Sequence, residues 1–83
     1  MNPIATQIDE LVNQIAQSLV DRPQEVRVNA IQGGQTIVLE LRVAKDDIGK
    51  IIGKQGRTAQ AIRTLLAAVS GKIKKRTVLE IVE

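Results

Sequence analysis

The spacing of hydrophobic residues changes from a helical to an alternating pattern near Pro23, and this change constrains the fold more than any other feature. The first segment places aliphatic residues at helical intervals: Ile4, Ile8, Leu11, Val12, Ile15 and Leu19. Asn2 and Pro3 are typical of an N-cap and a first helical position. Because Pro23 cannot continue a helix, we expect one from residue 3 to about Val20.

After Pro23 the aliphatic residues alternate with polar ones, which predicts two β-strands. One run covers residues 26–31 and the other covers residues 37–43, with Gly33-Gly34 between them. A glycine pair between alternating runs is typical of a hairpin turn. Gly33-Gly34-Gln35 also resembles the peptide-release loop of translation release factors, but its place between two strands favours the turn.

The second half of the chain predicts two helices and a strand. Ile48, Ile51 and Ile52 form the apolar face of a short helix that ends at Gly53, with Asp46 or Asp47 near its N-terminus. A longer helix is expected from about Arg57 to Val69, ended by Ser70-Gly71, and the β-branched run Val78–Val82 is expected as the last strand.

These elements follow one another in the order α-β-β-α-α-β. A crossover through helices favours parallel pairing of the last strand with the second strand. We therefore expect an α+β fold in which a three-stranded mixed sheet carries all three helices on one face. The length of 83 residues suits one domain, residues 1–83.

Missing residue types exclude several classes of function. The chain contains no Phe, Trp, Tyr, Cys or His. It therefore cannot stack bases on aromatic rings, form a thiolate metal site or use histidine as a general base. We expect a protein that is not an enzyme and has no cofactor and no metal. No apolar run is long enough to span a membrane and the N-terminus does not resemble a signal peptide, so a cytoplasmic location is expected.

Charge is distributed unevenly along the chain. Residues 1–41 have a net charge of −3, whereas residues 42–83 have a net charge of +6. Between Lys50 and Arg76 there are eight basic residues and no acidic one. Such a block indicates a polyanionic partner, and the alternative is a solvated surface that happens to be basic.

The segment Gly53-Lys54-Gln55-Gly56 must turn the chain between two helices in four residues. Glycine permits unusual backbone angles and lets a phosphate approach the backbone, and the following helix start attracts anions. Lys50 and Arg57 flank the loop. The alternative is a plain helical corner. A P-loop is excluded by the glycine spacing and by Gln55, which stands where Ser or Thr is needed.

Residues 48–58, Ile-Gly-Lys-Ile-Ile-Gly-Lys-Gln-Gly-Arg-Thr, resemble the signature of a KH domain, and the element order resembles the bacterial type II arrangement. Residues 53–64 are similar to the corresponding run of the KhpA family of stand-alone bacterial KH proteins. The resemblance covers essentially the whole chain.

This resemblance implies binding of single-stranded RNA, with the loop clamping the backbone of about four nucleotides. The implied RNA-binding residues are Ile48, Gly49, Lys50, Ile52, Gly53, Lys54, Gln55, Gly56 and Arg57, with strand residues around Val78 opposite. The run Lys72–Arg76 would supply a second positive rim through Lys74, Lys75 and Arg76, or else only keep an edge strand soluble.

The family also implies partners: a homodimer, or a heterodimer with a KhpB/Jag-type KH protein. It implies an RNA chaperone that affects cell shape and cell-wall homeostasis. The alternative function is a protein-interaction module that no longer binds RNA. Helix 57–69 is apolar over a wide arc, which suggests a dimer interface through Ala61, Leu65 and Ala68, unless the first helix covers that edge.

Overall fold

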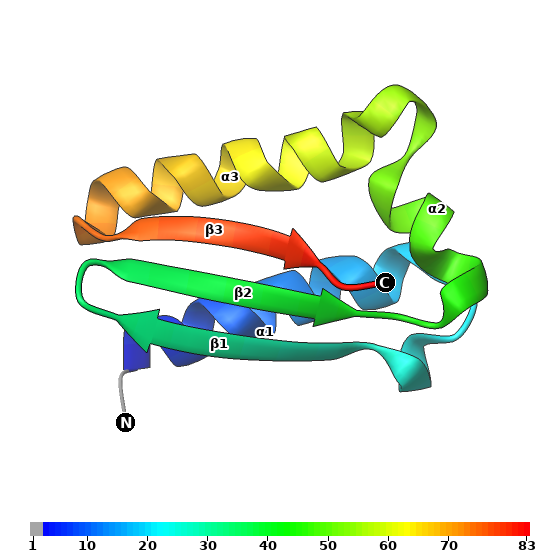
Figure 1. Cartoon of the computed structure of the whole chain (residues 1–83), viewed down its shortest axis with the longest axis horizontal. Coiled ribbons are helices and arrows are strands. Elements are labelled where there is room, and N and C mark those ends of the chain that lie inside the picture. The colour runs from blue at the N-terminus through cyan, green and yellow to red at the C-terminus, as the bar shows by residue number, and fades with distance from the viewer. Residues whose placement is uncertain (1–2) are drawn as a thin grey trace.

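The computed structural model describes the backbone of residues 3–83 and the side chains from residue 7 onwards. The helices and strands are α1 (Pro3–Leu19), β1 (Arg27–Gly33), β2 (Thr36–Arg42), α2 (Ile48–Ile52), α3 (Arg57–Ile73) and β3 (Arg76–Ile81) (Figure 1). This is the expected order. The proposed Asn2 cap and the side chain of Ile4 lie outside what the structure describes.

The sheet has the predicted mixed topology. Its strand order is β1-β2-β3, with β1 antiparallel and β3 parallel to β2. The hairpin turn falls on Gly34 and Gln35, because Gly33 still pairs with Thr36. Gly34 has a φ of 58°, a left-handed angle for which glycine is suited.

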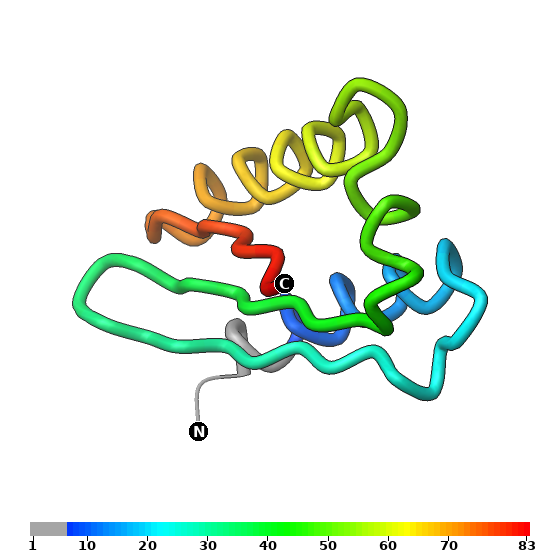
Figure 2. The backbone as a smooth tube through the Cα atoms, turned by 45° about the vertical axis from the view of Figure 1, so that its right-hand side comes forward, coloured from blue at the N-terminus to red at the C-terminus, as the bar shows by residue number. Residues whose placement is uncertain are grey.

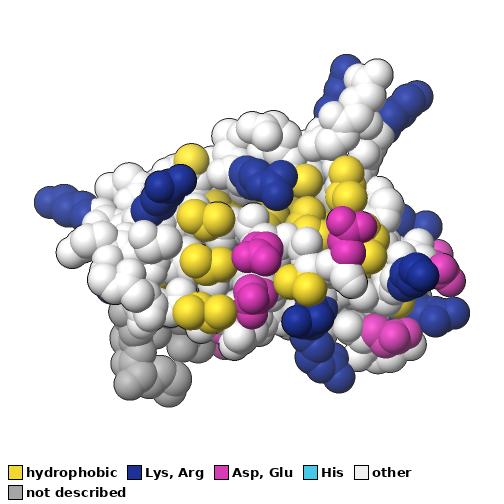
Figure 3. Space-filling view, in the orientation of Figure 1, with side chains coloured by type: hydrophobic (Ala, Val, Ile, Leu, Met, Phe, Trp, Pro, Cys, Tyr) yellow, Lys and Arg dark blue, Asp and Glu magenta, His cyan; other side chains and the backbone are white. Residues whose placement is uncertain are grey.

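The helices cover one face of this sheet, as predicted. Ile37, Leu39 and Leu41 on β2 are fully buried, whereas the residues between them are only half-buried. They pack against residues of all three helices: Ile8, Val12, Ala16, Ile51, Ile62 and Leu66. α1 lies over β1 and β2, while α3 lies over β3. The opposite face is open, and hydrophobic and acidic side chains lie side by side on it (Figure 3).

Two predicted boundaries in the second half are wrong. α3 does not end at Ser70-Gly71 but continues to Ile73, and β3 begins at Arg76 rather than Val78. Val69 and Ile73 both pack against the core, which favours one more helical turn. The Ser70 hydroxyl donates to the Leu66 carbonyl oxygen (2.9 Å) and accepts from the Thr77 amide (2.9 Å), so it ties the helix to the returning strand.

The alternative that the first helix covers the edge of α3 formed by Ala61, Leu65 and Ala68 is not what the structure shows. Leu65 remains 54% exposed, and Ala61 and Ala68 are exposed beside it. On α1 itself, Leu11 and Leu19 are exposed rather than part of a continuous buried stripe. No helix within residues 3–83 has the length and apolar character needed to cross a membrane.

Candidate nucleic-acid interface

The turn between α2 and α3 is built from left-handed backbone angles. Gly53, Gln55 and Gly56 have φ values of 78°, 59° and 73°. The Gly53 amide donates to the Gly49 carbonyl oxygen (2.8 Å), and the Gly56 amide donates to the Gly53 carbonyl oxygen (3.1 Å). Gln55 is a non-glycine residue in a conformation that costs on the order of 1–3 kcal/mol, and such residues cluster at functional sites.

Gly53 is required on two independent grounds. Its φ disfavours a side chain, and a Cβ added there would overlap the hydroxyl and backbone amide of Thr58. Gly56 differs, because a Cβ at that position would meet no neighbouring atom. The backbone of the loop therefore lies open beside Gly56, at the start of the 17-residue helix α3, where helix N–H groups favour an anion.

α2 has only five residues, so its position depends on tertiary contacts. Ile51 is fully buried in the core. The buried Asp47 carboxylate accepts from the backbone amides of Asp21 (3.3 Å) and Arg22 (3.1 Å). Asp47 stands directly before α2, as expected, but its side chain makes no capping hydrogen bond there. Through its two hydrogen bonds with the amides of Asp21 and Arg22, the Asp47 carboxylate links the start of α2 to the residues that follow α1.

Lys50 also points towards the end of α1. Its Nζ lies 3.5 Å from Asp21 Oδ2, and both side chains are exposed to solvent. An exposed ion pair of this kind contributes little to stability, so the ammonium can exchange partners. Of the cations expected around the loop, Lys50 is thus paired with Asp21, whereas Lys54 and Arg57 form no ion pair with any of residues 7–83.

A cleft of about 400 Å³ runs between the loop, α3 and the edge strand β3. We call it the loop cleft, and its lining residues are Ile52, Gly56, Ala59, Arg63, Leu79, Glu80, Ile81 and Glu83. Arg63 was missed by the sequence analysis. The signal was available, because Gly56, Ala59 and Arg63 follow helical i, i+3, i+7 spacing.

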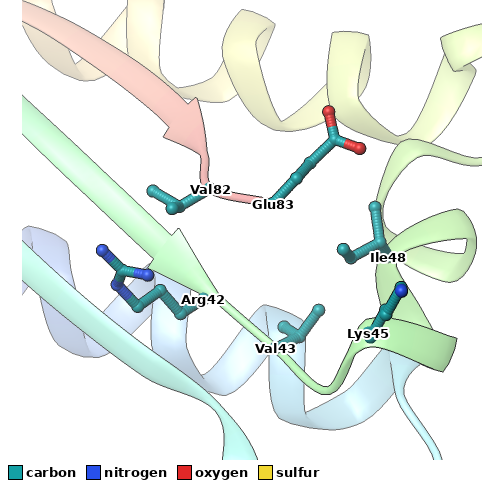
Figure 4. Close-up of a pocket in the computed structure, with 6 residues that line it drawn as sticks. All are labelled: Arg42, Val43, Lys45, Ile48, Val82 and Glu83. Atoms are coloured by element: carbon teal, nitrogen blue, oxygen red, sulfur yellow. The ribbon is translucent and has the colours of Figure 1, made fainter.

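A second cleft, of about 590 Å³, lies between the end of β2, the end of the chain and α2. We call it the Arg42 cleft, and its lining residues are Arg42, Val43, Lys45, Ile48, Val82 and Glu83 (Figure 4). Glu83 lines both clefts. The strand wall expected around Val78 is formed by Leu79, Glu80 and Ile81 in the loop cleft, while Val78 itself lines neither cleft.

The run expected as a second positive rim of the groove lies at the end of α3 that is far from the Gly53–Gly56 loop. Figures 1 and 2 show the loop at one end of α3 and the α3–β3 connection, with Lys74 and Lys75, at the other. The 17 residues of α3 span about 25 Å between them. Lys74, Lys75 and Arg76 therefore form a second positive pole rather than a wall of the loop cleft.

The family model described as "KhpA/KhpB, KH domain" matches residues 9–81. The chain belongs to this KhpA/KhpB family. One relative, the RNA-binding protein KhpA of Caldanaerobacter subterraneus, is 59% identical over 88% of this chain and 97% of its own. The KhpA of Chlamydia pneumoniae is 57% identical over 89% and 95%, and that of Aquifex aeolicus is 51% identical over 92% and 96%.

Solved structures of Era share this KhpA/KhpB fold. Aquifex aeolicus Era bound to GDP and aluminium fluoride superposes with a TM-score of 0.64 at 20% identity, covering 98% of this chain. Era in complex with MgGDPNP and nucleotides 1506–1542 of 16S ribosomal RNA gives a TM-score of 0.65 at 21% identity, covering 96% of this chain. The chain spans about a third of each Era chain, so the likeness concerns the fold alone.

Proposed function

We propose that this protein binds single-stranded RNA through the Gly53–Gly56 loop and the loop cleft, and that it does so without catalysis. The observation that carries the proposal is the loop itself. It presents open, left-handed backbone at the start of α3, with exposed Lys54 and Arg57 at either side. The curated relatives, which match over almost their whole length, are named RNA-binding proteins.

The chemistry of the loop cleft suits a flexible polyanion. Phosphates would lie against the loop backbone and the helix start, close to Lys54 and Arg57. Bases would lie on Ile52 and Ala59, and the Arg63 guanidinium offers both a charge and a flat surface for stacking. Most of the affinity would then come from contacts with the RNA backbone, so the preference for particular base sequences would be weak.

Substitution of both inner loop residues, Lys54→Asp with Gln55→Asp, tests this proposal. Both side chains are exposed, so the fold is expected to persist while two carboxylates repel the phosphates. We expect filter binding to single-stranded RNA to be lost with an unchanged circular dichroism spectrum. Unchanged affinity in a folded variant would overturn the assignment and favour a protein-interaction module.

We propose a partner surface on the side of α3 that does not line the loop cleft, where Leu65 is exposed together with Ala61 and Ala68. Small residues beside a leucine let another helix approach closely. The partner would be a second copy of this chain or a KhpB/Jag-type KH protein.

Membership of the KhpA/KhpB family is also the basis for proposing a cellular role. We propose that residues 1–83 act as one KH domain in the cytoplasm, as an RNA chaperone in post-transcriptional control linked to cell shape and cell-wall homeostasis. Sequencing of RNA crosslinked to the tagged protein in cells would identify the targets, and an absence of enriched RNA would contradict the role.

A further inference from the structure

We propose that an RNA strand held by the loop continues along α2 into the Arg42 cleft, where Arg42 and Lys45 bind its phosphates. The inference rests on the proposed function and extends it to a second subsite, beyond the four nucleotides that the loop would clamp. Its ligand is the flanking phosphodiester backbone of the same strand.

The two clefts form a continuous path. Glu83 lines both of them, and α2 contributes Ile52 to the loop cleft and Ile48 to the Arg42 cleft. Residues four positions apart lie one above the other on a helix, so these two isoleucines make one apolar ridge. Ile52 is 37% exposed, and Figure 4 shows Ile48 on α2 facing the space beside Glu83. Bases leaving the loop can therefore stay in contact with α2.

The charges at the end of this path fit a phosphate. Arg42 and Lys45 are exposed, and neither takes part in an ion pair with any of residues 7–83. Arg42 lies opposite Arg27 in the hairpin register, which places two like charges side by side. Arg27 is held by its own chain, because its Nη1 donates to the carbonyl oxygens of Gln24 and Val26. Of these two arginines, Arg42 is therefore the one whose guanidinium is available to an external anion.

Glu83 sets the orientation of the strand. Its carboxylate stands in the wall shared by the two clefts and repels phosphate, so the backbone would pass on the side of Arg42 and Lys45. The bases would then face Glu83, whose oxygens accept hydrogen bonds from base amino groups. By contrast, a strand reaching Lys74 would have to follow the length of α3 in the other direction.

The double variant Arg42→Gln/Lys45→Gln tests the subsite by RNA length. Affinity is measured by fluorescence anisotropy in 0.1 M salt with labelled single-stranded RNAs of four and twelve nucleotides. The four-nucleotide RNA should bind with less than a twofold change. The longer RNA should bind about ten- to thirtyfold more weakly, and its salt dependence should become shallower by about 1.4, for two lost phosphate contacts.

A matched control lowers the net charge by two elsewhere, through Arg22→Gln and Gln14→Glu, which line neither cleft. This control should change the affinity for the longer RNA less than twofold. Equal losses for both lengths, or an equal loss in the control, would overturn the subsite. A parent protein that binds neither RNA would instead overturn the proposed function, so the two failures are distinguishable. Thermal melting checks that both variants are folded.

Discussion

Different structural constraints act on Gly53, Gln55 and Gly56 in the loop. Gly53 is fixed by the Thr58 side chain packed against it, Gly56 by its left-handed angle alone, and Gln55 accepts the same left-handed region at a cost. The sequence predicted a tight turn with two glycines. It did not show that the two glycines are constrained differently, because the contact between Gly53 and Thr58 exists only in the folded structure.

We expect Gly53→Ala to be the most damaging loop substitution. It adds an overlap with Thr58 to the unfavourable φ, so the free energy of unfolding should fall by about 2–3 kcal/mol, from strain and repacking together. Gly56→Ala should cost only about 1 kcal/mol, from the backbone angle. Urea unfolding measures both values.

Gly49→Ala is the control, because Gly49 lies in α2 and a Cβ there would meet no atom within 4 Å. Alanine favours a helix, so stability should stay equal or rise by up to about 1 kcal/mol. If Gly53→Ala were as stable as Gly49→Ala, the close packing of the loop on Thr58 would be wrong.

At the scale of elements, the sequence predicted order and pairing better than boundaries. Pro23 and Gly34 mark the end of a helix and a turn through local backbone preferences, and the alternating hydrophobic pattern of β2 can be read directly from its residues. The end of α3 was missed because Ser70-Gly71 is a local stop signal. Packing of Val69 and Ile73 and the two hydrogen bonds of Ser70 override it.

The exposed edge of α3 yields a prediction about self-association. Leu65→Lys should leave the melting temperature of the dilute protein almost unchanged, because the side chain is 54% exposed in the single chain. In sedimentation equilibrium at high concentration, the unmodified protein should associate and the variant should remain monomeric.

Gln60→Lys adds the same charge at another exposed position of α3 and should associate as the parent does. A parent that stays monomeric at high concentration would end the homodimer proposal. A Leu65→Lys variant that still associates would move the interface to another surface.

At the scale of the whole molecule, the positive residues of the second half are spread over both ends of α3 and the Arg42 cleft. The sequence predicted the basic half of the chain, but it could not show that α3 holds Lys54 and Lys74 at opposite ends. It also missed Arg63, Glu80 and Glu83. Their part in the loop cleft depends on β3 being the sheet edge that faces α3, which is a tertiary arrangement.

Salt dependence tests how much of the binding comes from phosphates. About four neutralised phosphates predict that the logarithm of the association constant falls with the logarithm of salt concentration at a slope near −3 for single-stranded RNA. Titrations between 50 and 500 mM salt, about a decade, measure it. Replacing Lys74, Lys75 and Arg76 by Gln should make the slope shallower only for RNA long enough to reach that pole. A slope near zero would show that phosphate contacts do not hold the RNA.

The central claim, that RNA is bound at the Gly53–Gly56 loop and the adjoining cleft, is tested most directly by amide chemical-shift mapping during titration with a four-nucleotide single-stranded RNA. The account predicts the largest shifts at Gly53–Arg57 and at Ile52, with smaller ones at Arg63 and Ile81. The amide shifts of residues whose side chains lie on the open face of the sheet, such as Ile31 and Val38, should stay unchanged. Shifts centred on that open face or on α1, with the loop unaffected, would contradict it.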